Sequence, residues 1–350
     1  MLLTNAKLVD GRSVDLRIDG EQIAAIETTL DPRADESVID ADRKLLLPGA
    51  IDAHVHFRQP GDPHKETWET GTKSAAAGGV TTVIDMPNTS PPTTTGEHFE
   101  TKAAAAEAAC IDYGLNGGVT GDWTPDSLFD RPLCALGEVF LADSTGDMGV
   151  AADDFETAVG HAVDNDIMVT VHAEDETRFD DTARAGDAGG VGRAATADLW
   201  SQYRTAEAET AAIEYATAVG HETGADIHIA HTSTPEGIDA AIDGGATCEV
   251  CPHHLYLSRD DLDDLGTYGR MNPPLRDEDR RQAVFERVAN GAVDIVATDH
   301  APHTRQEKDA GLWDAPSGVP GVETMLPLLL ESARPAGPAY SRGVDLVAPT

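Results

Sequence analysis

Two histidines separated by one residue, His54 and His56, are the side chains of this sequence with the clearest chemical potential. They lie in the apolar segment Ile51–Phe57, which has the character of a strand. Alternate side chains of a strand point to the same face, so both imidazoles could bind one metal ion. A lone His-x-His pair is a weak signal, because buried histidines with ordinary hydrogen bonds are common. Its position at the end of a predicted strand makes the pair a candidate metal site.

Three further candidate ligands stand at the ends of other apolar segments. These are His172, His231 and Asp299. In a closed barrel of parallel strands, the C-terminal strand ends meet at one face, and active sites are built there. Each residue alone could be an ordinary core residue. Agreement among four separate strand ends favours a metal centre.

Imidazole and carboxylate ligands suit Zn²⁺, with Mn²⁺ or Co²⁺ as alternatives. Two ions about 3.5–4 Å apart could share one hydroxide at neutral pH, but they need a bridging ligand. Glu138, inside a predicted strand, could bridge them, and Asp143, just after that strand, is the rival. We favour Glu138 because an inward-facing strand residue has a fixed direction, and the choice stays open.

The elements that must position these residues alternate along the chain from residue 50 onward. Helical patterns lie between most of the predicted strands, for example at 97–110, 153–165, 205–222 and 278–290. Eight strands that alternate with helices predict an α/β fold of the (β/α)₈, TIM-barrel type. A doubly wound open sheet would normally show fewer strands and a glycine-rich phosphate turn, which the sequence lacks. The predicted strands are Ile51–Phe57, Thr81–Asp85, Ile111–Val119, Cys134–Leu141, Ile167–Ala173, Asp226–His231, Ala246–Pro252 and Asp294–Thr298.

The segment before the barrel has a different texture. Residues 1–49 contain short strands separated by turn signals such as Asp10-Gly11 and Asp19-Gly20, and they predict a small β-sandwich-like appendage. We therefore expect two domains, 1–49 and 50–350. The polar, glycine-rich stretch 178–197 predicts a mobile loop. The last residues, 343–350, begin like a helix and stop abruptly, so we expect a missing C-terminal part.

The charge of the chain is unusual, with 62 acidic against 25 basic residues and a formal net charge of −37. Nucleic-acid binders need the opposite sign, so this class is excluded. So much like charge would oppose compaction unless salt screens it, and at molar salt the Debye length is roughly 3 Å. We infer a salt-rich cytoplasm. The start of the chain does not resemble a signal peptide, and no apolar run reaches the length of a membrane span.

The four cysteines give no disulfide framework, which fits a reducing cytosol. Cys248 and Cys251 precede His253 and His254, a spacing similar to a zinc knuckle. No second ligand pair stands nearby, and the segment has the pattern of the seventh strand. We therefore interpret these cysteines as core residues.

Six motifs follow one another along the chain, from His54–Gly61 through Met86–Thr89 to Thr298–His303. Together they resemble those of dihydroorotases, a family of cyclic amidohydrolases. The resemblance covers about residues 1–340. It implies a barrel with two metal ions and a small-molecule substrate, without a nucleic-acid or membrane partner, and leaves a homo-oligomer open. The motifs are His54–Gly61, Ala75–Thr82, Met86–Thr89, Cys251–Leu255, Met271–Arg276 and Thr298–His303.

The resemblance also implies a reaction and roles for individual residues. The reaction is the reversible hydrolysis of dihydroorotate to N-carbamoyl-L-aspartate in pyrimidine biosynthesis. Arg58 would bind the ring carboxylate through its planar guanidinium, and Asp299 would move the proton from the hydroxide to the leaving ring nitrogen. The implied metal ligands are His54, His56, His172, His231 and Asp299, and the other implied substrate contacts are Asn88, Asn272, His303, Ser317 and Gly318.

One position departs from many relatives, and it keeps alternatives open. Where those relatives carry a lysine whose carbamate bridges the metals, this chain has Glu138. Allantoinases and hydantoinases share the expected fold and metals, but they generally lack an arginine directly after His-x-His, so Arg58 argues against them. A metal-free scaffold homologue is a further alternative, which the five retained ligands oppose.

Overall fold

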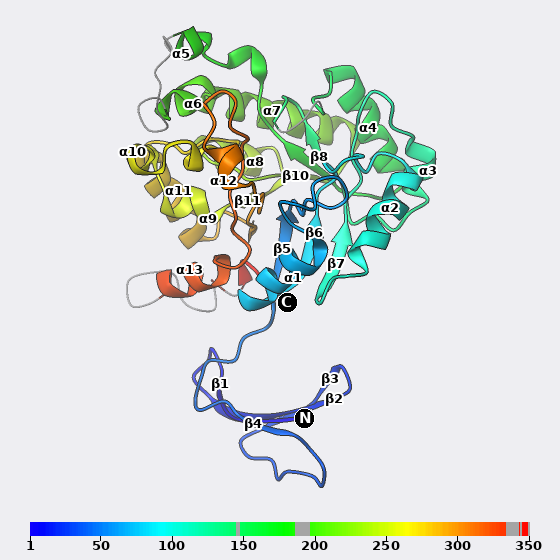
Figure 1. Ribbon diagram of the computed structural model, residues 1–350, viewed down its shortest axis with the longest axis vertical. Coiled ribbons are helices and arrows are strands. Elements are labelled where there is room, and N and C mark those ends of the chain that lie inside the picture. The colour runs from blue at the N-terminus through cyan, green and yellow to red at the C-terminus, as the bar shows by residue number, and fades with distance from the viewer. Residues whose placement is uncertain (145–147, 186–196, 334–342, 344, 349–350) are drawn as a thin grey trace.

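The structure is a computed structural model that describes residues 1–144, 148–185, 197–333, 343 and 345–348. Strands and helices from residue 50 onward form one rounded body, and the first four strands form a separate sheet below it (Figure 1). A single extended segment connects the two parts. Among the described residues, no helix combines the length and the apolar character needed to cross a membrane.

The N-terminal part is a four-stranded sheet in the order β3-β2-β1-β4. Its strands are β1 (Leu2–Lys7), β2 (Ser13–Asp19), β3 (Gln22–Glu27) and β4 (Val38–Asp40). β1 pairs with β2 antiparallel and with β4 parallel. The predicted β appendage is thus present, and within the described residues it consists of one sheet. That residues 1–49 form a domain of their own stays a prediction.

All eight predicted barrel strands are present, which confirms the predicted fold class. Sheet pairing gives a three-stranded group β5-β6-β7 and a five-stranded group β12-β11-β10-β9-β8. Parallel bridges from Gly117 to Leu136 and from Val55 to His300 join the groups on both sides, so the barrel closes. The strands are β5 (Ala50–Val55), β6 (Val80–Asp85), β7 (Asp112–Leu115), β8 (Leu136–Phe140), β9 (Val169–His172), β10 (Ile227–Ile229), β11 (Thr247–Val250) and β12 (Ile295–Val296).

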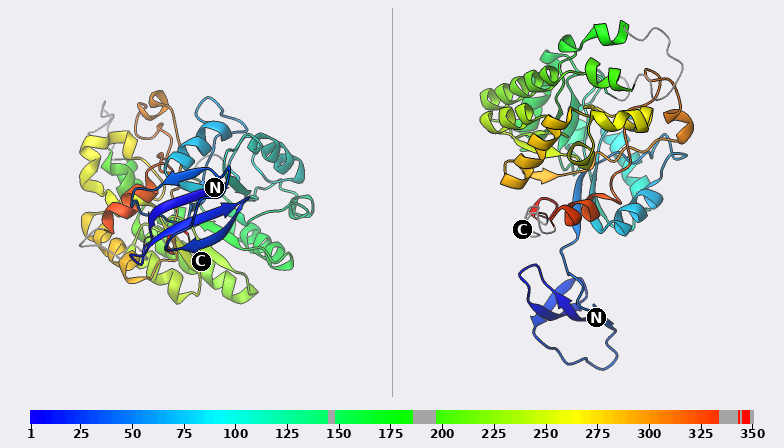
Figure 2. Two further views of the ribbon diagram at one scale, coloured as in Figure 1. Left: turned by 90° about the horizontal axis from the view of Figure 1, so that it is seen from below. Right: turned by 90° about the vertical axis from the view of Figure 1, so that its left-hand side faces the viewer.

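Helices surround the barrel on its outside, as the two views of Figure 2 show. Local sequence signals fix their ends: α7 begins where Thr205 accepts a hydrogen bond from Ala208 N, and it ends at Gly224 with φ +77°. The longer helices are α1 (Trp68–Ala77), α2 (Gly96–Ala106), α4 (Ala152–Asp164), α7 (Ala206–Thr223), α8 (Pro235–Asp243), α11 (Glu278–Asn290) and α13 (Met325–Ser332).

Shorter helices occupy the connections, several of them near the barrel mouth. The stretch predicted as a mobile loop contains one of them, α5, and its residues 186–196 lie outside the described part. The short helices are α3 (Pro125–Phe129), η1 (Glu176–Arg178), α5 (Asp181–Ala185), α6 (Asp198–Tyr203), α9 (Pro252–Tyr256), η2 (Arg259–Asp261), α10 (Leu262–Leu265), η3 (Gly266–Gly269) and α12 (Arg305–Lys308).

The hydrophobic core lies between the barrel strands and the helices around them. Small side chains make up much of it, and Phe57 and Trp68 are its largest fully buried members. Cys248 and Cys251 are also buried, as the sequence predicted for core cysteines, and neither forms a disulfide. This packing holds the strand ends, and with them the predicted site, in fixed positions.

Candidate active site

Two of the predicted ligands come from the end of β5. His54 and His56 point to the same side of the strand, and their Nε2 atoms lie 3.1 Å apart. His172 at the end of β9 and His231 just after β10 form a second pair, with His172 Nδ1 2.9 Å from His231 Nε2. All four imidazoles are buried at the C-terminal end of the barrel.

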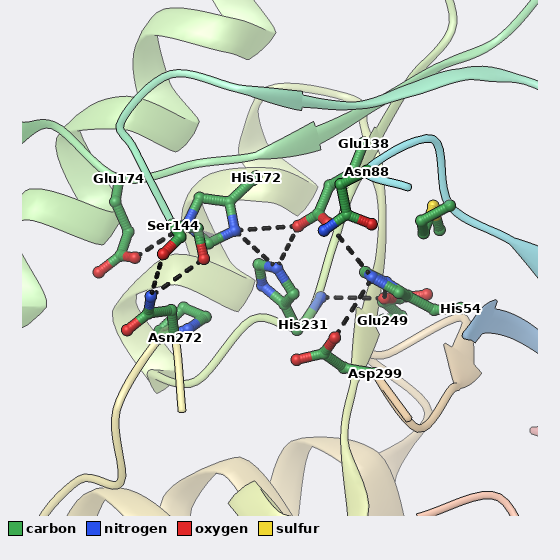
Figure 3. A network of polar contacts seen from close by, with 12 residues as sticks. His54, Asn88, Glu138, Ser144, His172, Glu174, His231, Glu249, Asn272 and Asp299 are labelled. Carbon is green, nitrogen blue, oxygen red and sulfur yellow. Dashed lines mark hydrogen bonds and ion pairs between the residues drawn. The ribbon is translucent and has the colours of Figure 1, made fainter. Parts of the chain in front are cut away.

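Glu138 of β8 lies between these two pairs of imidazoles, as Figure 3 shows for the labelled residues His54, His172 and His231. Its Oε1 atom is 2.9 Å from His172 Nδ1 and 2.6 Å from His231 Nε2. Its Oε2 atom is 3.5 Å from His54 Nε2. The rival Asp143 is exposed, and its Oδ1 accepts a hydrogen bond of 2.7 Å from Gly149 N. The structure thus brings Glu138 into the cluster and leaves Asp143 outside it.

Asp299 follows β12 and completes the cluster. Its Oδ1 atom lies 2.8 Å from His56 Nε2 and 3.6 Å from His54 Nε2. Asp299 and His231 have φ angles of +49° and +34°, a left-handed conformation that residues other than glycine rarely adopt. Strained backbone of this kind concentrates at functional sites, where the surrounding structure holds it.

The cluster contains several buried ionisable groups that shift one another's pKa. Burial opposes the charge of Glu138, but the nearby His231 and His54 hold the pKa of its carboxyl well below the ordinary value. Burial likewise opposes the charge of His172, yet hydrogen bonds with Glu138 and Glu174 raise its pKa to about 9. The carboxylates that favour protonated imidazoles here would also favour a bound metal cation, which would have to displace those protons. The donor set of nitrogen and carboxylate oxygen atoms fits zinc, manganese or cobalt.

A second layer of carboxylates stands behind the imidazoles, and sequence reasoning missed it. Glu249 of β11 places Oε1 2.5 Å from His54 Nδ1 and accepts a hydrogen bond of 3.1 Å from His231 N. Its Oε2 atom is 3.3 Å from His228 Nε2. The sequence feature that could have revealed Glu249 is its position inside a short buried strand, because a buried acidic side chain needs a partner.

Glu174 plays the corresponding part behind His172. Its Oε2 atom is 3.0 Å from His172 Nε2, and Arg204 binds the same carboxylate through Nε and Nη2. All three side chains are buried. Carboxylates in this position fix the orientation of ligand imidazoles and make them better ligands.

Five of the six predicted substrate contacts line a cavity that opens beside this cluster, and the sixth, His303, contacts Arg58 from outside that lining. Arg58 donates through Nε to Pro302 O at 3.0 Å, and its Nη2 lies 3.1 Å from His303 Nε2. Burial lowers the pKa of His303 to about 3, so this imidazole is neutral at pH 7. Asn88 contacts the imidazole–carboxylate cluster directly, with Oδ1 2.6 Å from His56 Nδ1. The cavity is lined by His56, Arg58, Asn88, Glu138, Phe140, Ser144, His172, His231, Asn272, Asp299, Ala301, Ser317 and Gly318.

The opposite wall of the cavity carries Asn272, Ser317 and Gly318. The side-chain amide of Asn272 is already engaged, since Oδ1 accepts from Trp200 Nε1 at 3.0 Å and Nδ2 donates to Ser144 Oγ at 3.0 Å. The hydroxyl of Ser317 is buried and has no hydrogen-bond partner within the described part of the chain. Of these two side chains, Ser317 therefore offers the freer polar group to a ligand.

The sequence matches known proteins along nearly its whole length. The family model described as "Dihydro-orotase-like" matches residues 43–237. A dihydroorotase of Halobacterium salinarum is 62% identical over 99% of this chain and 80% of the relative. A dihydroorotase of Methanosarcina mazei is 39% identical over 91% of this chain and 72% of the relative.

Solved structures of related enzymes share the fold. An L-hydantoinase (dihydropyrimidinase) from Arthrobacter aurescens superposes with a TM-score of 0.89 at 28% identity and covers 99% of this chain and 80% of its own. A dihydropyrimidinase from Brevibacillus agri gives a TM-score of 0.87 at 26% identity over 99% of this chain and 79% of its own. With its barrel, its imidazole–carboxylate cluster and these relatives, the chain belongs to the dihydroorotase family, within the cyclic amidohydrolases.

Proposed function

We propose that this protein catalyses the reversible hydrolysis of dihydroorotate to N-carbamoyl-L-aspartate, a step of pyrimidine biosynthesis. One observation carries the proposal. The buried guanidinium of Arg58 and the imidazole–carboxylate cluster line the same cavity. A ring that carries both a carboxylate and a cyclic amide fits this cavity. Its carboxylate would pair with the guanidinium of Arg58, and its amide would face the imidazole–carboxylate cluster.

The cluster would hold two divalent ions, of which zinc is our first choice. His54, His56 and Asp299 would bind one ion, His172 and His231 the other. Glu138, whose two oxygens face different imidazole pairs, would bridge them. When bound, such ions supply Lewis acidity and make hydroxide available at neutral pH. Manganese and cobalt suit the same donors and are outcomes that metal analysis distinguishes.

The side chains of this protein supply binding, orientation and proton transfer. Arg58 would bind the ring carboxylate with its planar fork, and neutral His303 would hold that guanidinium in place. Asn88 would complete this end of the pocket. Asp299 would accept the proton of the attacking water and return it to the leaving ring nitrogen. Nearby histidines keep the pKa of Asp299 low against the effect of burial, so the carboxylate begins as the base.

The working environment follows from the charge of the chain. A net charge of −37 is tolerable in a compact protein when concentrated salt screens the repulsion. We therefore place the enzyme in a salt-rich cytoplasm and would assay it in molar potassium chloride.

The neighbouring candidate is a hydantoinase or allantoinase, because the solved structures named above are hydantoinases or dihydropyrimidinases. Such substrates carry no ring carboxylate and would leave the buried guanidinium of Arg58 without an anionic partner. We would therefore measure hydrolysis of dihydroorotate, allantoin and hydantoin by protein loaded with zinc, manganese or cobalt. A chelator-treated sample provides the control.

We expect dihydroorotate to have the highest kcat/KM and the chelated sample to be inactive. Faster turnover of allantoin or hydantoin would assign the protein to that branch of the superfamily. Absence of both bound metal and turnover of any ring would favour the metal-free scaffold alternative.

A further inference from the structure

Lys308, at the end of α12, is a buried cation that the chemistry above does not use. Its side chain is only 4% exposed. Its Nζ atom donates to three backbone carbonyls, those of Arg270 at 2.9 Å, Pro316 at 3.0 Å and Gly318 at 3.0 Å. An ammonium group has three donors, so these contacts use all of them. Lys308 forms no ion pair with a carboxylate in the described part of the chain.

The three carbonyls belong to two segments that form one wall of the substrate cavity. Residues 316–318, which we call the serine loop, contribute Ser317 and Gly318 to the lining, and the segment after Arg270 contributes Asn272. Gly318 N also donates to Arg270 O at 3.0 Å. Lys308 therefore connects the two segments at the point where they face the cavity.

The contacts of the serine loop leave the Ser317 hydroxyl available to a ligand. The carbonyls of Pro316 and Gly318 accept from Lys308, and that of Ser317 lies 2.9 Å from His303 Nε2. Two of the three carbonyls of the loop are thus bound by Lys308, and the third faces His303. The hydroxyl of Ser317, buried and without a partner among the described residues, stays available at the cavity.

Arg270 strengthens the same wall from its other side. Its guanidinium donates through Nη1 to Leu312 O at 2.7 Å and also to Ala315 O. It lies over the ring of Trp200, 3.8 Å from the centroid, and Trp200 Nε1 donates to Asn272 Oδ1. The wall is therefore one connected unit. Arg270 and Lys308 bind its backbone carbonyls, and Arg270 also packs over the ring of Trp200.

A contribution to stability alone does not explain why a lysine occupies position 308. A buried charge without a carboxylate is costly, and an apolar side chain of similar length would pack without that cost. Burial and the charges of Arg270 and Arg58 do lower the pKa of Lys308, to about 7. Its three hydrogen bonds nevertheless favour the charged form, and they give the loop a fixed direction for its carbonyls, which packing alone cannot give.

We propose that Lys308 is a positioning residue for substrate recognition. Its three hydrogen bonds hold the serine loop against the Arg270 segment, so that the Ser317 hydroxyl faces a polar edge of the bound ring. The inference rests on the proposed function and deepens it, because it names a specificity element of the same site. Lys308 acts through the loop, while Ser317 would make the contact.

A double-mutant cycle tests this coupling. Lys308→Met, Ser317→Ala and the double variant would be compared with the parent for KM and kcat on dihydroorotate and for metal content. We expect each single change to raise KM about tenfold, with kcat less affected and metal content unchanged. In the Lys308→Met background, Ser317→Ala should add little, because the hydroxyl is already misplaced. Lys308→Arg, which keeps charge and donors, should restore part of the affinity.

Other results would overturn the proposal. An unchanged KM for Ser317→Ala would overturn it, whatever the Lys308 variants do. Fully additive effects of the two changes in the cycle would also overturn it. If Lys308→Met does not fold, Lys308→Gln replaces it in the cycle. Amide hydrogen exchange at Ser317 and Gly318 gives a readout that does not depend on turnover. The exchange should become faster in Lys308→Met and in Lys308→Gln. A parent that does not hydrolyse dihydroorotate would reject the proposed function, while unchanged exchange would reject the positioning role.

Discussion

The two sides of the cavity are built in opposite ways. The metal side consists of histidines and carboxylates at the ends of barrel strands, and further carboxylates, Glu174 and Glu249, stand behind its imidazoles. The substrate side consists of loop residues supported by the cations Arg58, Arg270 and Lys308, which form no ion pair with a carboxylate in the described chain. Backbone carbonyls and an aromatic ring surround these cations instead.

This difference shows how one pocket can favour both a cation and an anion. Acidic groups behind the imidazoles favour metal cations, whereas cations that lack carboxylate partners keep their field for an anionic ligand. The contrast is sharper in a chain with a net charge of −37, where an arginine can easily find a carboxylate. Within the described residues Arg58 has no such partner, which supports our proposal that it binds the anionic substrate.

The largest effect should come from breaking the metal side at its centre. Glu138→Ala removes the carboxylate that lies between both imidazole pairs, so metal content and activity should fall together. We expect a loss of kcat of at least about a thousandfold, because metal ions supply several kcal/mol of transition-state stabilisation. Asp143→Ala is the matched control, since Asp143 is exposed. Loss of metal in the control, with metal retained in Glu138→Ala, would reverse the assignment of the bridge.

The next largest effect should come from the substrate side. Arg58→Met should keep the metal content of the parent, because Arg58 contacts no metal-ligand candidate through a hydrogen bond in the described structure. Removing one partner of a buried charge pair costs about 2–5 kcal/mol, so kcat/KM for dihydroorotate should fall about 30-fold to several thousandfold. Arg58→Lys keeps the charge without the fork and should stay seriously impaired. Unchanged kinetics in Arg58→Met would remove the basis for choosing dihydroorotate.

A smaller effect should follow from changing the layer behind the imidazoles. Glu249→Gln keeps the shape of the side chain but loses the charge that faces His54 Nδ1. Second-layer partners of metal ligands typically contribute about 10- to 100-fold in affinity, and we expect a loss of metal affinity in this range. Metal titration monitored by the visible spectrum of bound cobalt would measure it. A cobalt affinity equal to that of the parent would show that Glu249 only fills space.

The smallest effect on the site should come from salt. Withdrawing salt removes the screening of 62 acidic side chains, so the melting temperature should fall by several degrees between molar and millimolar potassium chloride. The metal affinity should change less, because buried charges are screened less than exposed ones. The two quantities would be followed in the same buffers. A melting temperature independent of salt would contradict our interpretation of the charge.

The difference between the two sides of the cavity also explains which of their residues could be predicted from the sequence. The strands that carry the metal side have a regular alternation of apolar residues, and their ends were predicted to converge. In the structure, His54, His56, Glu138, His172, His231 and Asp299 do lie together. Their strand positions follow from local pattern, and the barrel geometry brings strand ends to one face.

The supporting residues were not predicted, because their roles depend on partners far along the chain. Glu249 supports His54, and Arg204 supports the Glu174 carboxylate. Lys308 binds backbone carbonyls that lie before and after α12 in the chain. No local period reveals such pairs. A charged residue within a buried strand, as at Glu249, is the one signal that a reader could use.

The bridge between Val55 and His300 is the seam where the first and last strands of the barrel meet. It also brings His56 beside Asp299, so both sides of the seam carry ligands. During synthesis on the ribosome, the chain therefore exposes His54 and His56 long before their carboxylate partner exists. If these residues hold the proposed metal ions, the full ligand set assembles only after the last strand emerges and the ring closes. A chain halted before residue 299 would hold an incomplete ligand set, and metal occupancy would then report completed synthesis as well as correct folding.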